Sequence, residues 1–599
     1  MKKKRIVSLL LAGVMAAAVF SLAACSDSER GYTTVKFLYG GPAETIDLFN
    51  GMLEQFRATA GEEKKISIKG NPVGETALPG AVTQRMPNAS GPDVAVITDH
   101  YFKFNCRFFE DMSNDFDADF RATLYPNAEI RGHYDLEKTT SNADDPLYGL
   151  PVMNDTSVLF YNRTALEAAG VKCISVEESD MDAFNAGAPD KNGNTKESLG
   201  IPADVTIPKK GFFRSISPYL PSSDVHDGSQ WRKPASNELM VFNDSIAMNW
   251  DEVEDVAMIC TKTRNNTSLT DYGYYTEWWF DYGWSVGGDC LQDMSGNGDW
   301  TMSLASSMPN YIVNEGKTYF GPHTGTTYEA GDTLDLRDIV GEQGDVISYY
   351  TDDKTEFYYT VNGQKAEVRD DITAKENDGT LTELPSIKEA LARFSYLAGV
   401  GGINVSPYPS AFNNTPSETY FSSGHLAFLV ELISCYDYIG KNADFEWGVA
   451  RMPVFKEYTD PSDPYCDTVA KQGKSAYHST GYSIVVKKNT KVRDAAIEFV
   501  RWMMTDGQKW LADQGYFSSR KQDREAMVEN SRYGNGEFLA SAMEEARPGD
   551  WWYMPDRVWI DEWAVPLNNN VRYGTMSFEE FIYKYITATN KALASYKKA

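Results

Sequence analysis

Aromatic side chains are the most abundant group in this sequence that could hold a ligand. The chain has 13 Trp and 35 Tyr residues. The densest run, residues 272–284, contains Trp278, Trp279, Tyr282 and Trp284. The apolar face of a pyranose ring stacks on such rings while its hydroxyl groups seek polar partners. Because most rings in a protein lie in its core, the sequence leaves open which of these face a ligand.

Two loops carry oxygen-bearing side chains at alternate positions, as a calcium loop requires. The first has them at Asp293, Ser295, Asn297 and Asp299, but Leu304 stands where the loop needs a Glu. The second, at Asp190, Asn192 and Asn194, is poorer in charge. Ordinary polar turns are the alternative for both. We expect no cofactor, with a structural Ca²⁺ at the first loop as the open alternative.

Other chemistry has little support in the sequence. The six His residues show no zinc-type spacing, and no G-x-S-x-G motif occurs. The formal net charge is −28, which makes the chain a poor partner for nucleic acid. Six cysteines beyond residue 25 are scattered without a C-x-x-C pair. Paired carboxylates for glycoside hydrolysis can always be found among 85 acidic residues, so their presence is uninformative.

The first 24 residues have the pattern of a secretory signal. Residues 2–5 are basic, residues 7–20 are apolar and uncharged, and Leu22-Ala23-Ala24 precedes Cys25. The apolar run is shorter than the roughly 20 residues that span a bilayer. Small residues before a cysteine resemble a bacterial lipobox, whose cysteine receives a lipid anchor. We expect cleavage before Cys25, a lipidated tether at residues 25–31, and a location on the extracellular face of the cell membrane.

The order of the expected elements indicates an α/β fold. Residues 33–39, 65–69 and 92–98 have strand patterns, and residues 46–60 have helical spacing. Strand, helix and strand in this order indicate a largely parallel sheet. Ligands of such sheets lie at the carboxyl ends of the strands, which here are followed by Tyr39 and Asp99. A carboxylate there can accept two strong hydrogen bonds from hydroxyl groups.

Residues 310–385 differ from the rest of the chain. They are acidic and strand-rich, with an Asn362-Gly363 turn between alternating runs. We interpret them as a small β-rich insertion. Ser386 and Glu389 then form a capping box before an amphipathic helix.

Five segments in order resemble the extracellular solute-binding proteins of ABC transporters, in particular the carbohydrate-binding type 1 family. They span residues 92–114, 148–171, 421–431, 445–455 and 481–520, and include PDVAV, YGLP, FYNR and GYSIVV. They bracket nearly the whole chain after the signal. The chain departs from the family in its length and in residues 517–520 (FSSR), where a proline is usual.

This resemblance implies a two-lobed, hinge-linked α/β fold of the type II periplasmic-binding-protein class, with the sugar held between the lobes. Lobe 1 is expected at residues 32–153 and 453–517, and lobe 2 at residues 154–452 and 518–599. The lobes close on the ligand by hinge motion. The protein is then no enzyme: it is a monomer that captures an oligosaccharide and delivers it to a membrane permease.

The resemblance also suggests ligand contacts. It implies an acidic contact at Asp99, and a contact from one of the two crossover residues Asn154 and Asp155. Glu431, at the end of an expected strand, is a further candidate. A stacking ring is expected from residues 278–284, and another from Trp551, Trp552, Trp559 or Trp563.

Three alternatives remain open from the sequence. A glycoside hydrolase would need two carboxylates at a set separation. A surface glycan-binding lipoprotein built from helical repeats would show internal repeats, and we find none. Within the transporter class, the solute could instead be a non-sugar such as a peptide.

Overall fold

The computed structural model describes residues 31–594 apart from 219–229, 294–299, 305, 341–346, 351–356, 362–363, 399–401, 409–414 and 550–557. Several predicted features lie outside the described residues: Cys25, Ser295, Asn297, Asp299, the Asn362-Gly363 turn, Trp551 and Trp552. Of the helices that are described, none has the length and apolar character needed to cross a membrane.

A nine-stranded mixed sheet runs through the molecule. Its main path is β2 (Ile66–Gly74), β1 (Thr33–Gly41), β3 (Val94–Thr98), β22 (His478–Val486), β4 (Leu150–Asn162), β18 (Leu426–Leu432) and β8 (Tyr272–Tyr275). β19 (Trp447–Ala450) pairs with β4, and β23 (Arg547–Pro548) pairs with β22. β1 is parallel to both β2 and β3, which confirms the α/β fold class. β3 is almost fully buried, as its continuous apolar sequence predicts.

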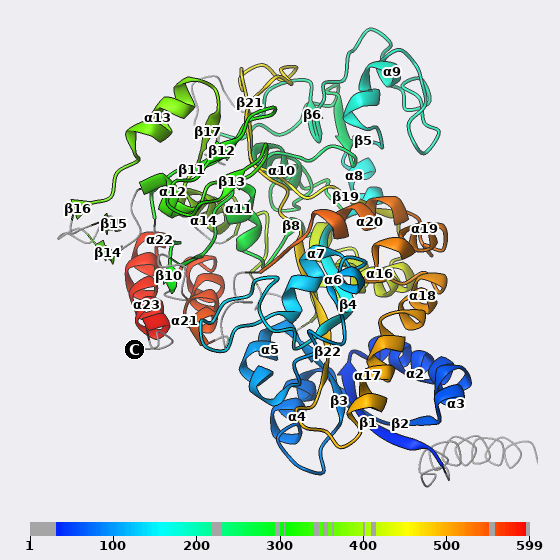
Figure 1. Cartoon of the computed structure of the whole chain (residues 1–599). Coiled ribbons are helices and arrows are strands. Elements are labelled where there is room, and N and C mark those ends of the chain that lie inside the picture. The colour runs from blue at the N-terminus through cyan, green and yellow to red at the C-terminus, as the bar shows by residue number, and fades with distance from the viewer. Residues whose placement is uncertain are drawn as a thin grey trace, which may run out of the picture.

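β4 is shared by two halves of the molecule. Its first half pairs with β22, and its second half pairs with β18 and β19. Figure 1 shows β4 and β22 running from the part of the molecule that contains β1–β3, in blue, into the rest of the molecule. Two large apolar cores lie on either side. The smaller includes α2 (Ala43–Ala58) and α17 (Arg493–Met503), and the larger includes α10 (Trp250–Ile259), α11 (Phe280–Ser285) and α14 (Ile387–Tyr396). We call these halves lobe 1 and lobe 2.

Residues 453–477 pack with lobe 2, whereas the sequence predicts them in lobe 1. These residues were expected in lobe 1, but Phe455, Ala476 and Tyr477 belong to the core of lobe 2. The cause is a hairpin of β20 (Lys456–Tyr458) and β21 (Val469–Gln472), which is held to lobe 2 where Lys474 N–H donates to Ser285 O at 2.9 Å. The chain therefore returns to lobe 1 within β22.

Helices flank the sheet and the two cores. Those of lobe 1 and its connections are α3 (Ala60–Lys64), α4 (Leu78–Arg85), α5 (Asp99–Asn105), α6 (Ala118–Arg121), α7 (Pro126–Glu129) and α18 (Asp506–Asp513). Those of lobe 2 are α8 (Arg163–Ala168), α9 (Met181–Asn185), α15 (Ser417–Ser422), α16 (Tyr436–Asn442), α19 (Arg524–Glu529), α20 (Gly536–Glu545), α21 (Val558–Pro566), α22 (Phe578–Phe581) and α23 (Thr587–Leu593). The helices of residues 558–593 lie beside the insertion (Figure 1).

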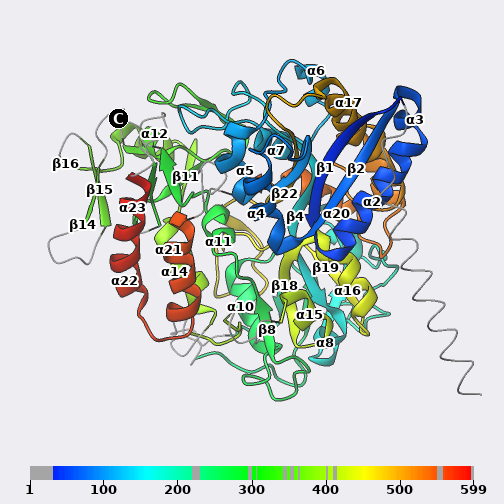
Figure 2. The same ribbon diagram turned by 90° about the horizontal axis from the view of Figure 1, so that it is seen from below.

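The insertion is rich in short antiparallel strands, as the sequence predicts. β11 (Asn310–Val313) pairs with β17 (Leu381–Leu384), β12 (Tyr319–Phe320) with β13 (Thr327–Tyr328), and β14 (Ile347–Tyr350) with β15 (Phe357–Val361), which also pairs with β16 (Gln364–Lys365). It also contains α12 (Leu336–Val340) and α13 (Asp370–Asn377). Ser386 and Glu389 form the predicted capping box of α14. Figure 2 shows β14–β16 at the edge of the molecule farthest from β1 and β2.

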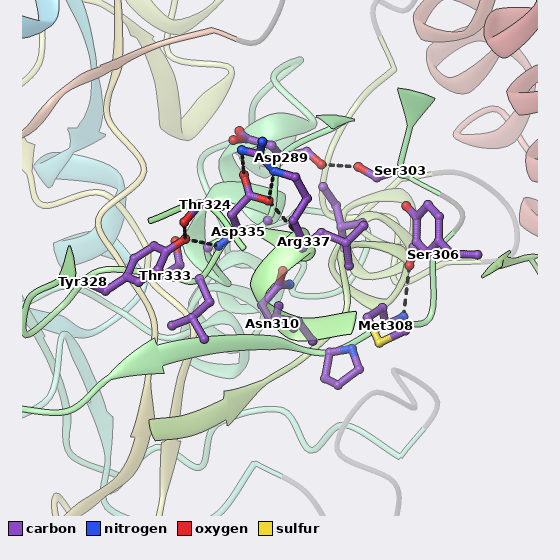
Figure 3. A pocket seen from close by; sticks show the side chains of 18 of the residues that line it. Asp289, Ser303, Ser306, Met308, Asn310, Thr324, Tyr328, Thr333, Asp335 and Arg337 are labelled. Carbon is purple, nitrogen blue, oxygen red and sulfur yellow. Dashed lines mark hydrogen bonds and ion pairs between the residues drawn. The ribbon is translucent and has the colours of Figure 1, made fainter. Parts of the chain in front are cut away.

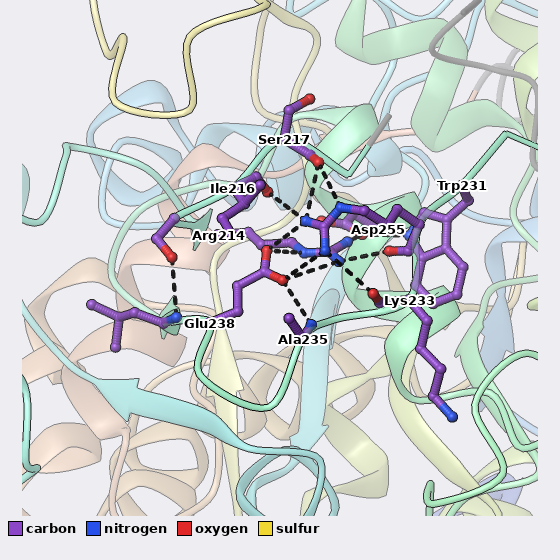
Figure 4. A network of polar contacts seen from close by, with 11 residues as sticks. Arg214, Ile216, Ser217, Trp231, Lys233, Ala235, Glu238 and Asp255 are labelled. Atoms are coloured by element: carbon purple, nitrogen blue, oxygen red, sulfur yellow. Dashed lines mark hydrogen bonds and ion pairs between the residues drawn. The ribbon is translucent and has the colours of Figure 1, made fainter. Parts of the chain in front are cut away.

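A buried ion-pair network holds the polar section between β5 (Val171–Ile174) and α10. In β6 (Phe212–Arg214), which pairs with β7 (Met240–Asn243), Arg214 Nε donates to Glu238 Oε1 at 2.6 Å and Nη1 donates to Asp255 Oδ1 at 2.9 Å (Figure 4). All three side chains are buried. Because an unpaired buried charge is strongly destabilising, these pairs help to fix the path of the section, together with its own small apolar core around Met181, Phe184 and Ile246.

Candidate functional site at the crossing strands

Strands β4 and β22 run between the two lobes, and we call them the crossing strands. A buried polar network lies beside them, at the junction of the lobes. Asp99 follows β3, Arg131 lies in the short turn Ile130–Gly132, and Asn154 lies in β4. Arg131 Nη1 donates to Asp99 Oδ2 at 2.8 Å, and Nη2 donates to Asn154 Oδ1 at 3.0 Å. Thr480 of β22 donates to Asp99 Oδ2 at 3.1 Å. Sequence reasoning found Asp99 and Asn154 but missed Arg131, which stands in no recognisable motif.

Three buried atoms of this network have no hydrogen-bond partner within the described part of the chain. They are Asp99 Oδ1, Arg131 Nε and Asn154 Nδ2, and none of the three residues is more than 5% exposed. A buried polar atom without a partner costs about 1–3 kcal/mol. The network therefore holds one acceptor and two donors whose hydrogen-bonding capacity the described residues leave unused.

Asp155 and Glu431 add two carboxyl groups on the lobe 2 side. Asp155 Oδ1 accepts hydrogen bonds from Thr156 N–H at 3.0 Å and from Ser434 N–H at 3.1 Å. Burial raises the pKa of Asp155 to about 6. Glu431 Oε2 accepts from the Ser417 hydroxyl at 2.6 Å.

The pKa of Glu431 is raised further, to about 8. Burial is the largest cause, and the neighbouring carboxylates of Glu277 and Glu418 act in the same direction. Glu431 is therefore mostly protonated at neutral pH. A protonated carboxyl both donates and accepts hydrogen bonds, as a sugar hydroxyl does. Either group can therefore be the donor in a hydrogen bond between Glu431 and a sugar.

Lobe 1 contributes Glu75 and Tyr482 to the same region. Burial raises the pKa of the Tyr482 phenol, and Glu75 and Asp155 raise it further. The pKa of Glu418, in lobe 2, is also raised by burial and then by Glu75. Groups of both lobes therefore act on one another electrostatically. A Cβ on Gly41 would lie 3.0 Å from the Tyr482 hydroxyl, which places this hydroxyl at the carboxyl end of β1, as the sheet topology predicts for a ligand site.

Trp278 is the predicted stacking residue that lies beside the crossing strands and keeps part of its ring accessible. It is half-buried, whereas Trp279, Tyr282 and Trp284 are buried. Its ring stacks on Phe280 at 6.0 Å between centroids, and it meets His478, the first residue of β22, edge-on at 5.7 Å. The accessible part of the indole can serve as a stacking platform.

The remaining described aromatic candidates are core residues. Trp279 packs edge-on against Trp563 at 4.2 Å, Tyr282 lies 5.1 Å from the Trp250 ring, and Trp284 lies 4.6 Å from the Phe280 ring. Trp559 is fully buried, and the buried Tyr39 donates its hydroxyl to Asn50 Oδ1 at 2.6 Å. The high density of rings in residues 272–284 is therefore explained by the core of lobe 2 around α11. We do not include the five buried side chains named in this paragraph in the candidate ligand site.

Of the two loops that resemble a calcium loop in sequence, the structure describes the one at Asp190 fully and the one at Asp293 only in part. The carboxylate of Asp190 accepts hydrogen bonds from the backbone N–H groups of Asn192 at 2.9 Å, Asn194 at 2.7 Å and Ser175 at 3.2 Å, as in a polar turn. Asp293 ends β9 (Leu291–Asp293) and pairs with Trp300 of β10 (Trp300–Met302), while the loop between these strands lies outside the described residues. No group of three or more His, Cys, Asp or Glu residues within the described ranges could hold a metal ion.

Comparisons with known proteins bear on the fold. No protein-family model matches the chain, and no curated protein matches it. Solved structures do match. The ABC substrate-binding protein Lmo0181 from Listeria monocytogenes, in complex with cycloalternan, has a TM-score of 0.53 and 12% identity, over 94% of this chain and 99% of its own. This chain has a periplasmic-binding-protein fold.

Two further structures agree. The cyclic alpha-maltosyl-1,6-maltose binding protein from Arthrobacter globiformis has a TM-score of 0.51 and 13% identity, over 94% of this chain and 100% of its own. The sugar-binding protein MalE from Xanthomonas citri has a TM-score of 0.51 and 13% identity, over 94% of this chain and 98% of its own. Identities this low carry the fold alone. The periplasmic-binding-protein fold places the crossing-strand residues at the junction between its two lobes.

Proposed function

We propose that the chain is the substrate-binding lipoprotein of an ABC importer, which captures an oligosaccharide between its lobes and delivers it to a membrane permease. The observation that carries the proposal is the set of polar and aromatic groups gathered at the crossing strands. The similarly folded Listeria protein was solved in complex with cycloalternan, and the Arthrobacter protein is a cyclic alpha-maltosyl-1,6-maltose binding protein. Both of these ligands are oligosaccharides.

The contacts suit a neutral sugar. Asp99 Oδ1 and Asn154 Nδ2 would accept and donate one hydrogen bond each to ligand hydroxyl groups. Asp155 and the protonated Glu431 would bind further hydroxyls. Trp278 would stack on the apolar face of one pyranose ring. Binding of this kind makes and breaks no covalent bond.

Uptake also requires a change of shape and a place at the membrane. Strands β4 and β22 connect the lobes, so bending there would let the lobes close on the ligand. The ligand stabilises the closed form only by its higher affinity for it. The predicted lipid on Cys25 would hold the protein near its permease and raise its effective concentration there. In this proposal the protein acts as a monomer.

Calorimetric titration of the purified protein tests the proposal. We expect saturable binding of at least one neutral oligosaccharide from a panel of α- and β-linked glucans, and no binding of tripeptides. Chromatography of the same sugars after long incubation should show no shorter products. Binding of peptides alone would contradict the sugar assignment, and released monosaccharide would favour a glycoside hydrolase instead.

A test of the anchor is separate. Cells fed a palmitate analogue should label the wild-type protein and not the Cys25→Ala variant, which should appear in the medium or periplasm. Equal labelling of both would contradict the lipoprotein assignment.

A further inference from the structure

A second pocket lies away from the crossing strands, between the insertion and the core of lobe 2. Its volume is about 320 Å³. Its walls come from the loop after α11, the start of β11, the β12–β13 hairpin and α12 (Figure 3). None of Asp99, Asn154, Asp155, Trp278 and Glu431 lines it. Ligand pockets span about 300–1,000 Å³, so this one suits a ligand the size of a single sugar unit.

The lining combines hydroxyl groups with apolar side chains. Ser303, Ser306, Thr324, Thr333 and Tyr328 supply hydroxyl groups. Met308, Leu334 and Ile387 supply apolar surface. A hexose has the same two characters, with hydroxyl groups around its edge and an apolar ring face.

The carboxylates around the pocket are either paired with guanidinium groups or buried. Arg337 binds Asp335 through Nε at 2.9 Å and Nη2 at 3.0 Å, and Asp289 forms an ion pair with Arg547. Figure 3 shows Asp289, Asp335 and Arg337 grouped on one side of the pocket. A third carboxylate, Asp338, is fully buried behind Thr324 and Tyr328, whose hydroxyl groups donate to it. The lining therefore has no excess of positive charge to hold an anion and no exposed carboxylate without a cationic partner to hold a cation, which favours a neutral ligand.

Two polar atoms in the lining remain available to such a ligand. The Asn310 amide nitrogen donates to Pro385 O at 2.8 Å, while its oxygen has no hydrogen bond to any residue that the structure describes. The same holds for the Thr333 hydroxyl. These two groups can accept from and donate to sugar hydroxyls without breaking an existing contact.

We propose that this pocket binds one neutral hexose unit, at a site separate from the one between the lobes. The site belongs to the β-rich insertion, so it goes beyond the proposed function of the crossing strands. Its occupant is a monosaccharide or the terminal unit of a longer chain.

Saturation-transfer NMR on the full chain, with free glucose, galactose and mannose as probes, tests the proposal. Thr326 is exposed and lines the pocket, so Thr326→Trp should fill its entrance and weaken binding of the preferred hexose by at least about tenfold. Thr327→Trp is the matched control, because Thr327 is exposed and adjacent but does not line the pocket; it should leave binding unchanged. Thr333→Val removes one hydroxyl at constant shape and should weaken binding about fivefold.

The same experiment separates this site from the one between the lobes. Trp278→Ala should leave hexose binding intact, and the charged probes glucosamine and glucose 6-phosphate should bind more weakly than glucose. The proposal is overturned if no hexose binds the wild-type protein, if Thr326→Trp binds as well as wild type, or if Trp278→Ala alone abolishes binding. Each of those results would overturn the hexose site alone. The proposed function is tested separately, by calorimetric titration with oligosaccharides.

Discussion

Burial has different consequences at the crossing strands and in the α11 stretch next to them. At the crossing strands it falls on charged and polar groups, which either pair, as Arg131 and Asp99 do, or change their pKa, as Glu431 does. At α11 it falls mainly on rings that pack against one another, from Trp279 to Trp284, and on one carboxyl, Asp281, whose pKa burial raises well above its usual range. At the crossing strands burial therefore acts mainly on hydrogen bonds and charge, whereas at α11 it acts mainly on packing. Substitutions in the two regions should therefore change different quantities.

The largest expected effect on stability comes from the rings. Trp284→Ala removes a side chain that is 1% exposed, and we expect it to lower the free energy of unfolding by about 3–5 kcal/mol. Phe320→Ala, at a ring that is 60% exposed, should change it by less than about 0.5 kcal/mol. Denaturant unfolding followed by tryptophan fluorescence measures both, and equal midpoints would contradict the core assignment of α11.

An effect of comparable size is expected from the buried ion pair. Arg131→Met leaves the Asp99 carboxylate buried without its cation, which should cost about 3–5 kcal/mol. The control is Lys509→Met, which breaks the exposed pair with Asp513 and should leave the free energy of unfolding nearly unchanged. Adding Asp99→Asn to Arg131→Met should restore part of the lost stability. If the double variant is no more stable than Arg131→Met, the charge of Asp99 is not the cause of the loss.

Ionisation of Glu431 should make the stability of the protein depend on pH, and we expect this effect to be smaller than the two above. Its pKa in the folded protein, about 8, lies above the ordinary value of 4.5. The folded state therefore holds a proton that the unfolded state loses, so this group's contribution to stability is fully present below pH 4.5 and is lost as the pH rises to about 8. Glu431→Gln cannot ionise, so its stability relative to wild type should increase across that range. An unchanged difference between pH 5 and pH 8 would contradict the raised pKa.

Asp155 should show a narrower version of the same behaviour. Its pKa rises from 3.8 to about 6, so the stability of Asp155→Asn relative to wild type should increase between about pH 4 and pH 6 and then level off. Unfolding midpoints measured every half pH unit would resolve the two windows. Identical profiles for the Asp155 and Glu431 variants would show that the two carboxyls titrate as one coupled pair.

Much of the fold was predictable because it depends on patterns that are local in the chain. The parallel start of the sheet, the β-rich character of the insertion and the capping box of Ser386 all follow from short sequence patterns. The lobe boundary near residue 453 was not predictable, because the β20–β21 hairpin is held to lobe 2 by the distant residue Ser285.

The site was predictable only where the sheet topology fixes it. Asp99 and Asn154 lie at a strand end and a crossover, which sequence patterns locate. Arg131 was missed because its two partners lie 32 and 23 residues away. The rings at Trp279, Tyr282 and Trp284 looked equivalent to Trp278 in the sequence, and only their packing partners separate them.

The central claim is that the ligand lies at the crossing strands and stacks on Trp278. Calorimetric titration of Trp278→Ala with the best oligosaccharide ligand tests it most directly, with Phe320→Ala as the control ring. We predict an affinity about tenfold or more below that of the wild type for Trp278→Ala, corresponding to about 1.4 kcal/mol or more, with a smaller loss of stability than Trp284→Ala. Phe320→Ala should leave the affinity unchanged. Wild-type affinity in Trp278→Ala would contradict the account.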